Sequence, residues 1–288
     1  MKIISCAAIM ATLCMSATAE MIGHGIDRRR YVSETEMKTV PFNSIVHLDD
    51  SATGTFIAPG LVLTCNHCIE GRDFINVVTT DGTDFTGSKF QSTVQAEHLD
   101  AGLVSTDGFD VPYLDISPEE SVGTPVKLAG YGGLKVLTND ELKIVKKVYQ
   151  QVLHNLKQKN EDITGINLMI EVELELRKYA CKTDTQKDCV HCAYPQCIFN
   201  DGDNLKVQDD CHITGYDEQF MHVDCTASIG YSGAAILRRD DNKIVGIVSN
   251  GIPTIGVNKN ADIRVARPKY YYDGVQKMRD IALQAVKK

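Results

Sequence analysis

Short apolar runs alternate with turn-forming residues along the chain from Pro41 onward. Closely spaced runs of this kind, separated by Gly, Pro and Asp, are typical of antiparallel β-barrels and β-sandwiches. The pattern pauses between Asp115 and Thr124, so we expect a first β unit at 41–120 and a second at 121–288. The predicted strands are 44–48, 56–58, 61–63, 74–78, 103–104, 126–130, 243–248 and 261–266, and a helical pattern predicts a C-terminal helix at 273–288.

The pattern becomes helical inside the second unit. Thr138 and Glu141 form a capping-box signature, and apolar residues then recur at helical spacing, which predicts a helix at about 139–156. Residues 166–176 alternate between apolar and polar, as in a half-buried strand. We expect this helical and cysteine-rich segment to be an insertion at about 138–212. It either packs on the flank of the β unit or serves a partner.

Composition and charge narrow the class of protein. The 288 residues are 43% hydrophobic and 24% charged, which suits one or two globular domains with a substantial core. The net charge of −8, without a basic stripe, argues against a nucleic-acid partner. Residues 1–19 combine Lys2, an apolar run and a small-residue end, which predicts a signal peptide cleaved after Ala19. We therefore expect a secreted or periplasmic protein without a membrane span.

A serine between glycines is the first candidate for chemistry. Gly230, Tyr231, Ser232 and Gly233 predict a tight turn before a buried strand, because glycine adopts backbone conformations that a β-carbon forbids. Such a turn can aim backbone N–H groups at one point beside the hydroxyl, as a developing oxyanion requires. The alternative is an ordinary turn between two strands.

Two upstream residues supply the partners that a serine nucleophile needs. His67 follows an apolar strand pattern, and Asp100 lies in an apolar segment, where a carboxylate is costly unless a partner satisfies it. An aspartate can fix the tautomer of an imidazole, which can then take the proton of a serine. Taken singly, His67 can also be a core histidine and Asp100 a turn carboxylate.

Together these stretches resemble the trypsin-like (chymotrypsin-fold) serine peptidases, most closely their bacterial glutamyl-endopeptidase-like branch. The chain order His, Asp, Ser is that of chymotrypsin and differs from that of subtilisin and the α/β-hydrolases. The resemblance implies an all-β fold of two six-stranded antiparallel β-barrels, with His67 and Asp100 from the first barrel and Ser232 from the second. It rests on stretches in a fixed order, at 54–59, 63–68, 100–104, 129–132, 230–233 and 246–251.

The resemblance also implies a function. It suggests a secreted, monomeric serine endopeptidase that forms an acyl-enzyme with protein or peptide substrates, without a metal or organic cofactor. The N–H groups of Gly230 and Ser232 then form the oxyanion hole. The implied substrate-binding residues carry no charge, so we expect a small or uncharged preferred side chain. They are Thr226, Ala227, Ser249, Asn250 and Gly251.

The resemblance leaves the N-terminal segment open. Residues 20–40 are either an arm that packs around the barrel, which the resemblance favours, or a pro-segment cut near Arg28–Arg30. Many relatives pair a newly freed N-terminus with an aspartate just before the nucleophile. Tyr231 stands there in this chain, so we do not expect that activation switch.

The chain has ten cysteines. Removal of the predicted signal peptide, which contains Cys6 and Cys14, leaves eight to be paired. The spacing around His191 is also that of a zinc site, but behind a signal peptide disulfides are favoured. For Cys68, relatives have a partner near 53–55, where this chain has none, so a bridge to Cys65 and a free thiol both stay open. One predicted bridge joins Cys211 to Cys225. Two more are predicted within the group Cys181, Cys189, Cys192 and Cys197.

Two other classes of protein remain. One is a secreted binding protein on a catalytically degenerate peptidase fold, which Cys65, Asn66, Tyr231 and the insertion suggest. The other is a cysteine-stapled structural or adhesion domain in which Ser232 is only part of a turn. The presence of His67, Asp100 and Ser232 together speaks against both.

Overall fold

The structure is a computed structural model of the chain. It describes residues 28–49, 52–89, 100–132, 136, 138–158, 175, 204–218, 220–227, 230–251 and 263–285. Three predictions lie outside the described residues: the signal peptide at 1–19, the strand at 166–176 except for residue 175, and the bridges among Cys181, Cys189, Cys192 and Cys197.

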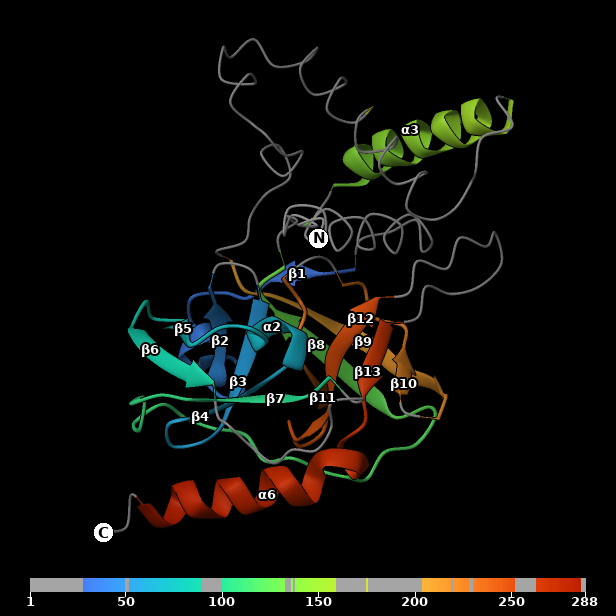
Figure 1. Ribbon diagram of the computed structural model, residues 1–288. Helices are drawn as coiled ribbons and strands as arrows, with labels where there is room; N and C mark the ends of the chain where they lie inside the picture. The colour runs from blue at the N-terminus through green and yellow to red at the C-terminus, as the bar shows by residue number, and fades with distance from the viewer. Residues whose placement is uncertain are drawn as a thin grey trace, which may run out of the picture.

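Six strands close into the first barrel, in the order β2-β3-β4-β7-β6-β5, and every neighbouring pair is antiparallel (Figure 1). Alternation in β5 shows how the sequence directs the barrel, because Ile75 and Val77 are buried while Phe74 and Asn76 are exposed. The core between these strands includes Phe56 and Val104. The strands are β2 (Ile45–Leu48), β3 (Ala52–Ala58), β4 (Leu61–Thr64), β5 (Phe74–Thr79), β6 (Asp84–Lys89) and β7 (Gly102–Ser105).

The second sheet runs in the order β1-β9-β10-β13-β12-β11-β8, and β8 pairs in addition with β9. Strands β8 to β13 therefore form a closed ring of their own, and β1 is added at the edge of β9. The two barrels predicted from the sequence are thus confirmed. The strands are β1 (Arg30–Tyr31), β8 (Pro125–Gly130), β9 (Lys206–Tyr216), β10 (Phe220–Val223), β11 (Ala235–Arg238), β12 (Ile244–Gly251) and β13 (Ile263–Ala266).

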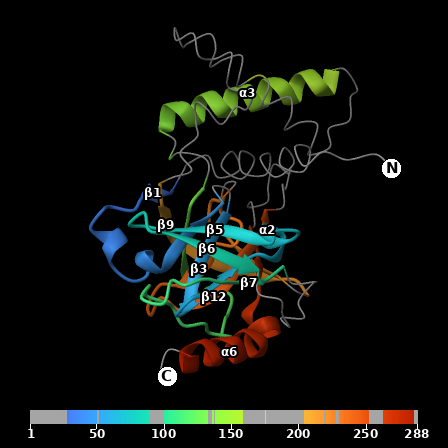
Figure 2. The ribbon, with the colours of Figure 1, turned by 60° about the vertical axis from the view of Figure 1, so that its left-hand side comes forward.

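Helices α3 and α6 lie on opposite sides of the barrels (Figures 1 and 2). Helix α6 (Pro268–Ala285) covers both barrels, since its Tyr271 and Val275 pack into one core with residues of β3, β4, β11 and β12. It begins at Pro268, before the predicted start at 273, and proline is well suited to a first helical position. The short helical elements are η1 (Glu36–Lys38), η2 (Phe42–Ser44) and α2 (Asn66–Ile69).

Helix α3 (Asn139–Gln158) confirms the helix and the capping box read from the sequence. The Thr138 N–H donates to Glu141 Oε2 at 2.8 Å, and the Glu141 N–H donates to Thr138 Oγ1 at 3.3 Å. These reciprocal bonds satisfy two donors that a helix start leaves unpaired. None of the described helices has the length and apolar character needed to cross a membrane.

Strand β9 is the longest of the strands that the sequence pattern did not predict. It begins at Lys206, so the end of the predicted insertion at 138–212 belongs to the second barrel. Polar residues occupy buried positions at its start: Lys206 is fully buried, with Nζ donating to the Gly132 carbonyl at 2.8 Å, and Gln208 is 1% exposed. Because polar residues take these buried positions, apolar alternation fails as a strand signal here.

The described part of the predicted N-terminal arm packs on the second barrel. Strand β1 pairs with β9, and Arg28 Nη2 donates to the Asp224 carbonyl at 2.5 Å. Arg30 binds Glu36 through Nη1 and Nη2, at 3.0 and 2.9 Å, and its Nε donates to Asp209 of β9 at 3.1 Å. Residues from Arg28 onward are therefore tied to the barrel by backbone and charge together.

The Arg30–Glu36 pair predicts a pH-dependent contribution to stability. The hydrogen bond from Arg30, aided by Ser33, lowers the pKa of Glu36 from 4.5 to about 2. Because the folded-state pKa is the lower one, the contribution is complete above about pH 4.5 and is lost as the pH falls through about 2. Glu36→Gln should lower the free energy of unfolding by a few tenths to about 1 kcal/mol at neutral pH, since the pair is partly exposed.

Urea unfolding across this pH range checks the prediction. The difference between wild type and Glu36→Gln should shrink toward pH 2. The exposed neighbour Glu34 provides the control, and Glu34→Gln should change little at any pH. A Glu36→Gln effect that is independent of pH would contradict the assignment.

Candidate active site

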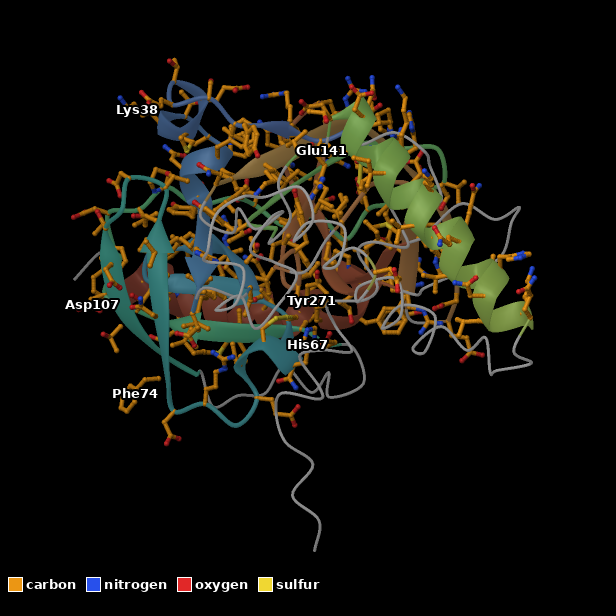
Figure 3. All side chains as sticks on the ribbon, turned by 90° about the horizontal axis from the view of Figure 1, so that it is seen from above. Lys38, His67, Phe74, Asp107, Glu141 and Tyr271 are labelled. Atoms are coloured by element: carbon orange, nitrogen blue, oxygen red, sulfur yellow. A yellow bond between two sulfur atoms is a disulfide. The ribbon has the colours of Figure 1, made fainter. Side chains whose placement is uncertain are left out.

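His67 lies on α2, just after β4 (Figure 3). The Asp100 carboxylate holds its imidazole. The Asp100 Oδ2 atom is 2.6 Å from Nδ1 of His67, and Oδ1 accepts the His67 backbone N–H at 2.8 Å. The two side chains are 32% and 20% exposed. A carboxylate on Nδ1 favours the tautomer that carries its proton there, so Nε2 is left as the proton acceptor.

The second barrel reaches the same carboxylate. Ser249 on β12 is buried, and its Oγ donates to Asp100 Oδ2 at 2.6 Å. The Asp100 carbonyl accepts the N–H of Asn66 at 3.1 Å. Asp100 adopts a φ of +52°, a left-handed conformation that aspartate tolerates better than most residues.

The Ser232 turn is fixed by a strand of the first barrel. The Ser232 carbonyl accepts the Thr53 N–H at 2.9 Å, and Thr53 Oγ1 donates to the Gly230 carbonyl at 2.7 Å. The same hydroxyl oxygen accepts the Tyr131 N–H at 2.9 Å. A buried threonine on β3 thus joins the turn to the end of β8.

Gly233 explains why this turn needs glycine. Its φ is +81°, and a β-carbon would collide with Thr64 Oγ1 and with the Thr53 carbonyl. The Gly233 N–H donates to the Val248 carbonyl at 2.8 Å. The backbone that follows Ser232 therefore lies against the end of β4, three residues before His67.

Several hydrogen-bonding groups of the candidate site have no partner in the described part of the chain. Among the described residues, the N–H groups of Gly230 and Ser232 and the Ser232 hydroxyl form no hydrogen bond. The His67 Nε2 atom lies 3.6 Å from Cys65 Sγ and 3.7 Å from Cys68 Sγ. The expected Ser232–His67 hydrogen bond is thus not formed here, and such catalytic bonds often tighten only when substrate binds.

The predicted substrate-binding residues fall into two groups. Thr226 and Ala227 are buried, and the Thr226 N–H donates to Gln208 Oε1 at 2.7 Å. Residues 249–251 continue β12 beyond Ile247, the last residue that this strand pairs with β11. Within the described chain, that edge of β12 has no strand beside it.

Asp224 is not directed to the pocket. Its Oδ1 accepts the His212 backbone N–H at 2.5 Å, and its carbonyl accepts Arg28 Nη2. The carboxylate is therefore used in holding β9.

The described cysteines form two bridges. Cys211 and Cys225 are joined, which confirms the predicted pair. Cys65 and Cys68 are also joined, so the open question about Cys68 is answered by a bridge within one turn of chain.

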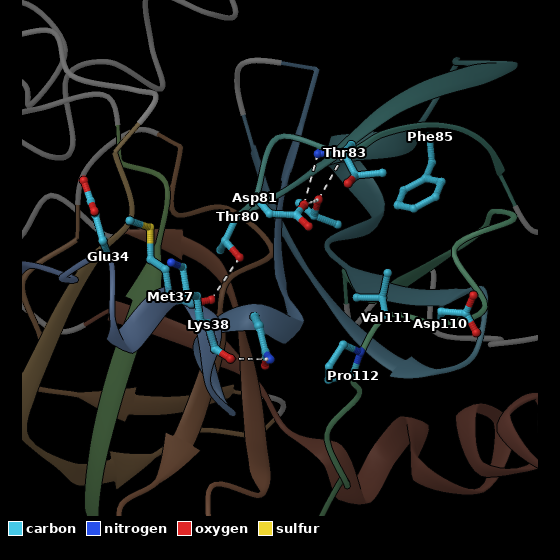
Figure 4. A pocket seen from close by; sticks show the side chains of 12 residues that line it. Glu34, Met37, Lys38, Thr80, Asp81, Thr83, Phe85, Asp110, Val111 and Pro112 are labelled. Atoms are coloured by element: carbon cyan, nitrogen blue, oxygen red, sulfur yellow. Dashed lines mark hydrogen bonds between the residues drawn. The ribbon is translucent and has the colours of Figure 1, made fainter.

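A cavity of about 630 Å³ lies apart from these residues (Figure 4). It is bordered by η1 and by the turn between β5 and β6, and no predicted catalytic residue lines it. Its lining includes Lys38, Asp81 and Phe85. Asp81 is held by the Thr79 hydroxyl and the Thr83 N–H, which lower its pKa.

Sequence reasoning missed two positioning residues, Thr53 and Gln208. Both place a hydrogen-bonding side chain in a barrel strand, at 0% and 1% exposure. For Thr53 the available signal was a polar residue ahead of an apolar strand. Its partner across the barrels cannot be read from local sequence.

Comparison with known proteins agrees with this fold. Residues 52–173 match the family model of the trypsin-like peptidase domain. A Glu endopeptidase solved in complex with MPD aligns with a TM-score of 0.53 and 17% identity, covering 89% of this chain and 98% of its own. At that identity the likeness concerns the fold.

Two further structures are more distant. The Rv3671c protease in its inactive form has a TM-score of 0.47 and 12% identity, with 82% of this chain and 88% of its own covered. The serine endoprotease from Yersinia pestis has a TM-score of 0.47 and 13% identity, with 84% of this chain and 63% of its own covered. No curated protein sequence matches significantly.

The double barrel with a serine turn between its halves defines a chymotrypsin-like fold. The match of residues 52–173 to the trypsin-like peptidase family model agrees with this fold and with the resemblance read from the sequence.

The role of Thr53 gives a stability prediction. Thr53→Val removes a hydroxyl that donates to the Gly230 carbonyl and accepts the Tyr131 N–H, and leaves both buried groups unpaired. We expect the free energy of unfolding to fall by about 1–3 kcal/mol. Denaturant unfolding measures it.

The same strand offers a matched control. Thr55 is equally buried, but its Oγ1 has no hydrogen-bond partner. Thr55→Val should therefore be neutral or slightly stabilising. Equal losses at both positions would show that the bonds of Thr53 do not fix the turn.

Proposed function

We propose that the protein is a serine endopeptidase that hydrolyses peptide bonds through Ser232, His67 and Asp100, with an acyl-enzyme intermediate. The observation that supports this most is the Asp100 carboxylate, 2.6 Å from His67 Nδ1 and bonded by Ser249 of the other barrel. A carboxylate so placed leaves Nε2 as the base, and the serine turn proposed to work with it is fixed by Thr53.

The three side chains divide the proposed mechanism between them. Ser232 Oγ attacks the scissile carbonyl while His67 Nε2 takes its proton. Asp100 stabilises the imidazolium, which returns the proton to the leaving amine. Water then attacks the acyl-enzyme while His67 Nε2 takes a proton from it. That proton passes to Ser232 Oγ as the bond to the acyl group breaks and the acid leaves.

The oxyanion is assigned to the N–H groups of Gly230 and Ser232. Their lack of other partners among the described residues supports this role, because donors already bonded to the protein are not free to bind the oxyanion. Losing one such donor typically lowers turnover by about 10²–10³-fold.

The substrate is proposed to be an extended peptide. The edge of residues 249–251 that β11 leaves uncovered fits an added strand, held by backbone hydrogen bonds. The side-chain pocket is assigned to Thr226 and Ala227, neither of which is charged, and Asp224 is bonded to β9. A small or uncharged side chain is therefore the preferred neighbour of the cleaved bond.

The enzyme is proposed to act as a secreted or periplasmic monomer without a cofactor. The N-terminal pattern supports export, with cleavage after Ala19. The Cys211–Cys225 bridge supports an oxidising compartment.

One observation favours a second candidate, a catalytically degenerate binding protein. The His67 Nε2 atom faces two sulfurs, and no described hydrogen bond joins it to Ser232. An edge that binds an extended peptide does not require a working base, so such a protein would keep the peptide groove and lose turnover.

Labelling by a fluorophosphonate separates the two candidates. The wild type should react at Ser232, because the reagent needs an activated serine hydroxyl and an oxyanion hole. Ser232→Ala should abolish labelling, and His67→Ala should slow it by at least about 10³-fold. Mass spectrometry of the labelled peptide identifies the site.

Two variants serve as controls. Ser121→Ala and His154→Ala change the same residue types at exposed positions remote from the site, and should label as the wild type does. A folded wild type that does not react, or labelling that survives Ser232→Ala, would favour the binding protein.

A further inference from the structure

Three possible metal ligands meet at the catalytic histidine. Cys65 Sγ, His67 Nε2 and Cys68 Sγ all lie within 4.8 Å of one another. Two cysteines and one histidine are a common zinc donor set, with a fourth position left for water or another ligand. The cysteines are bridged in this structure, so the donors become available only when the bridge opens.

The distances to the imidazole already suit a tetrahedral zinc ion. With Zn–S bonds of about 2.3 Å and Zn–N bonds of about 2.0–2.1 Å, sulfur and nitrogen in such a site are about 3.5 Å apart. The observed separations are 3.6 Å to Cys65 and 3.7 Å to Cys68. After reduction, only the two sulfurs need to move apart.

Asp100 completes the arrangement from the other side of the ring. Metal-binding histidines usually donate their second N–H to a carboxylate, which fixes the tautomer and makes the metal-facing nitrogen more basic. Asp100 Oδ2 at 2.6 Å from Nδ1 provides that bond. The carboxylate assigned to the catalytic base therefore prepares Nε2 equally well for a metal.

We propose that Cys65, Cys68 and His67 form a redox-gated zinc site that switches the peptidase off. In the oxidised chain the bridge holds both sulfurs and Nε2 is free. In the reduced chain the two thiolates and Nε2 bind one Zn²⁺, and a metal-bound Nε2 cannot take the proton of Ser232. The inhibition rests on the proposed peptidase function, whereas the zinc site does not.

The chemistry of the switch is balanced. A dithiol reductant closes to its own disulfide as the Cys65–Cys68 bond breaks, and its two hydrogens pass to the two sulfurs. Binding of Zn²⁺ then releases these two protons to the solvent. Oxidation by a disulfide reverses the first step and expels the metal.

The chain contains a natural comparison for the switch. The Cys65–Cys68 bridge spans three residues, whereas the Cys211–Cys225 bridge spans fourteen and joins two strands of the second barrel. In the chain-entropy view, the shorter loop adds less stability. Opening the Cys65–Cys68 bridge should therefore leave the barrels folded.

The test compares metal binding by oxidised and reduced full chain. A phosphine is the reductant, since it becomes phosphine oxide with oxygen from water and does not compete for zinc as a dithiol would. Bound Zn²⁺ per chain is measured by competition with a chromophoric chelator, and Co²⁺ reports thiolate ligation through its charge-transfer absorption. Other reduced cysteines can also bind Zn²⁺, so the number of ions at this site is taken as the difference in bound Zn²⁺ between wild type and each variant.

The expected result is specific to one pair of cysteines. When reduced, Cys65→Ser/Cys68→Ser should bind one Zn²⁺ fewer than the wild type, and Cys211→Ser/Cys225→Ser should keep that ion. His67→Ala leaves every cysteine in place and should lower the affinity for this Zn²⁺ ion by at least about tenfold. It also provides a variant should the double cysteine change prevent folding.

Activity gives the second readout. Zn²⁺ should abolish fluorophosphonate labelling of the reduced wild type and leave labelling of the oxidised wild type unchanged. A chelator should restore labelling of the reduced wild type. Equal zinc binding in wild type, Cys65→Ser/Cys68→Ser and His67→Ala would overturn the site. Oxidised wild type that never reacts with the reagent would count against the peptidase function alone, and the zinc count would still decide the site.

Discussion

The two barrels have to meet at a fixed distance for any chemistry at Ser232, and Thr53 sets that contact. Its N–H and its hydroxyl bind two carbonyls of the serine turn, while its own oxygen accepts a bond from β8. All three bonds are buried, where an unpaired polar group is costly. Sliding one barrel against the other would break them together, so the position of the turn is determined by the first barrel.

The other half of the site depends on the same docking. Asp100 comes from the first barrel but takes a hydrogen bond from Ser249 of the second, so the carboxylate is oriented by both. The imidazole follows the carboxylate through Nδ1. The direction of Nε2 is then decided by its nearest neighbours, and in this structure these are the Cys65 and Cys68 sulfurs. The proposed proton acceptor and the proposed metal ligand therefore share one geometry, and the state of the two cysteines would decide between them.

Much of the fold could be read from the sequence because its signals are local. Alternation and turn residues located most barrel strands, and the Thr138–Glu141 capping box located the start of α3. Strand β9 was missed because Lys206 and Gln208 are buried polar residues, which only the surrounding barrel can satisfy. The start of α6 at Pro268 was missed because Tyr271 packs in a core shared by both barrels, which the helical pattern alone does not show.

For the candidate site, too, local sequence signals could be read and contacts between distant residues could not. Short motifs identified His67, Asp100 and Ser232, and the structure joins the first two directly. The bonds of Thr53 and the direction of Nε2 were not predictable, because they depend on residues distant in sequence.

A crystal structure of the chain after reaction with a fluorophosphonate tests the central claim most directly. It should show phosphorus on Ser232 Oγ, the phosphoryl oxygen on the N–H groups of Gly230 and Ser232, and Thr53 Oγ1 still bonded to the Gly230 carbonyl. An adduct on another residue, or a turn that has left Thr53 while the adduct forms, would contradict it.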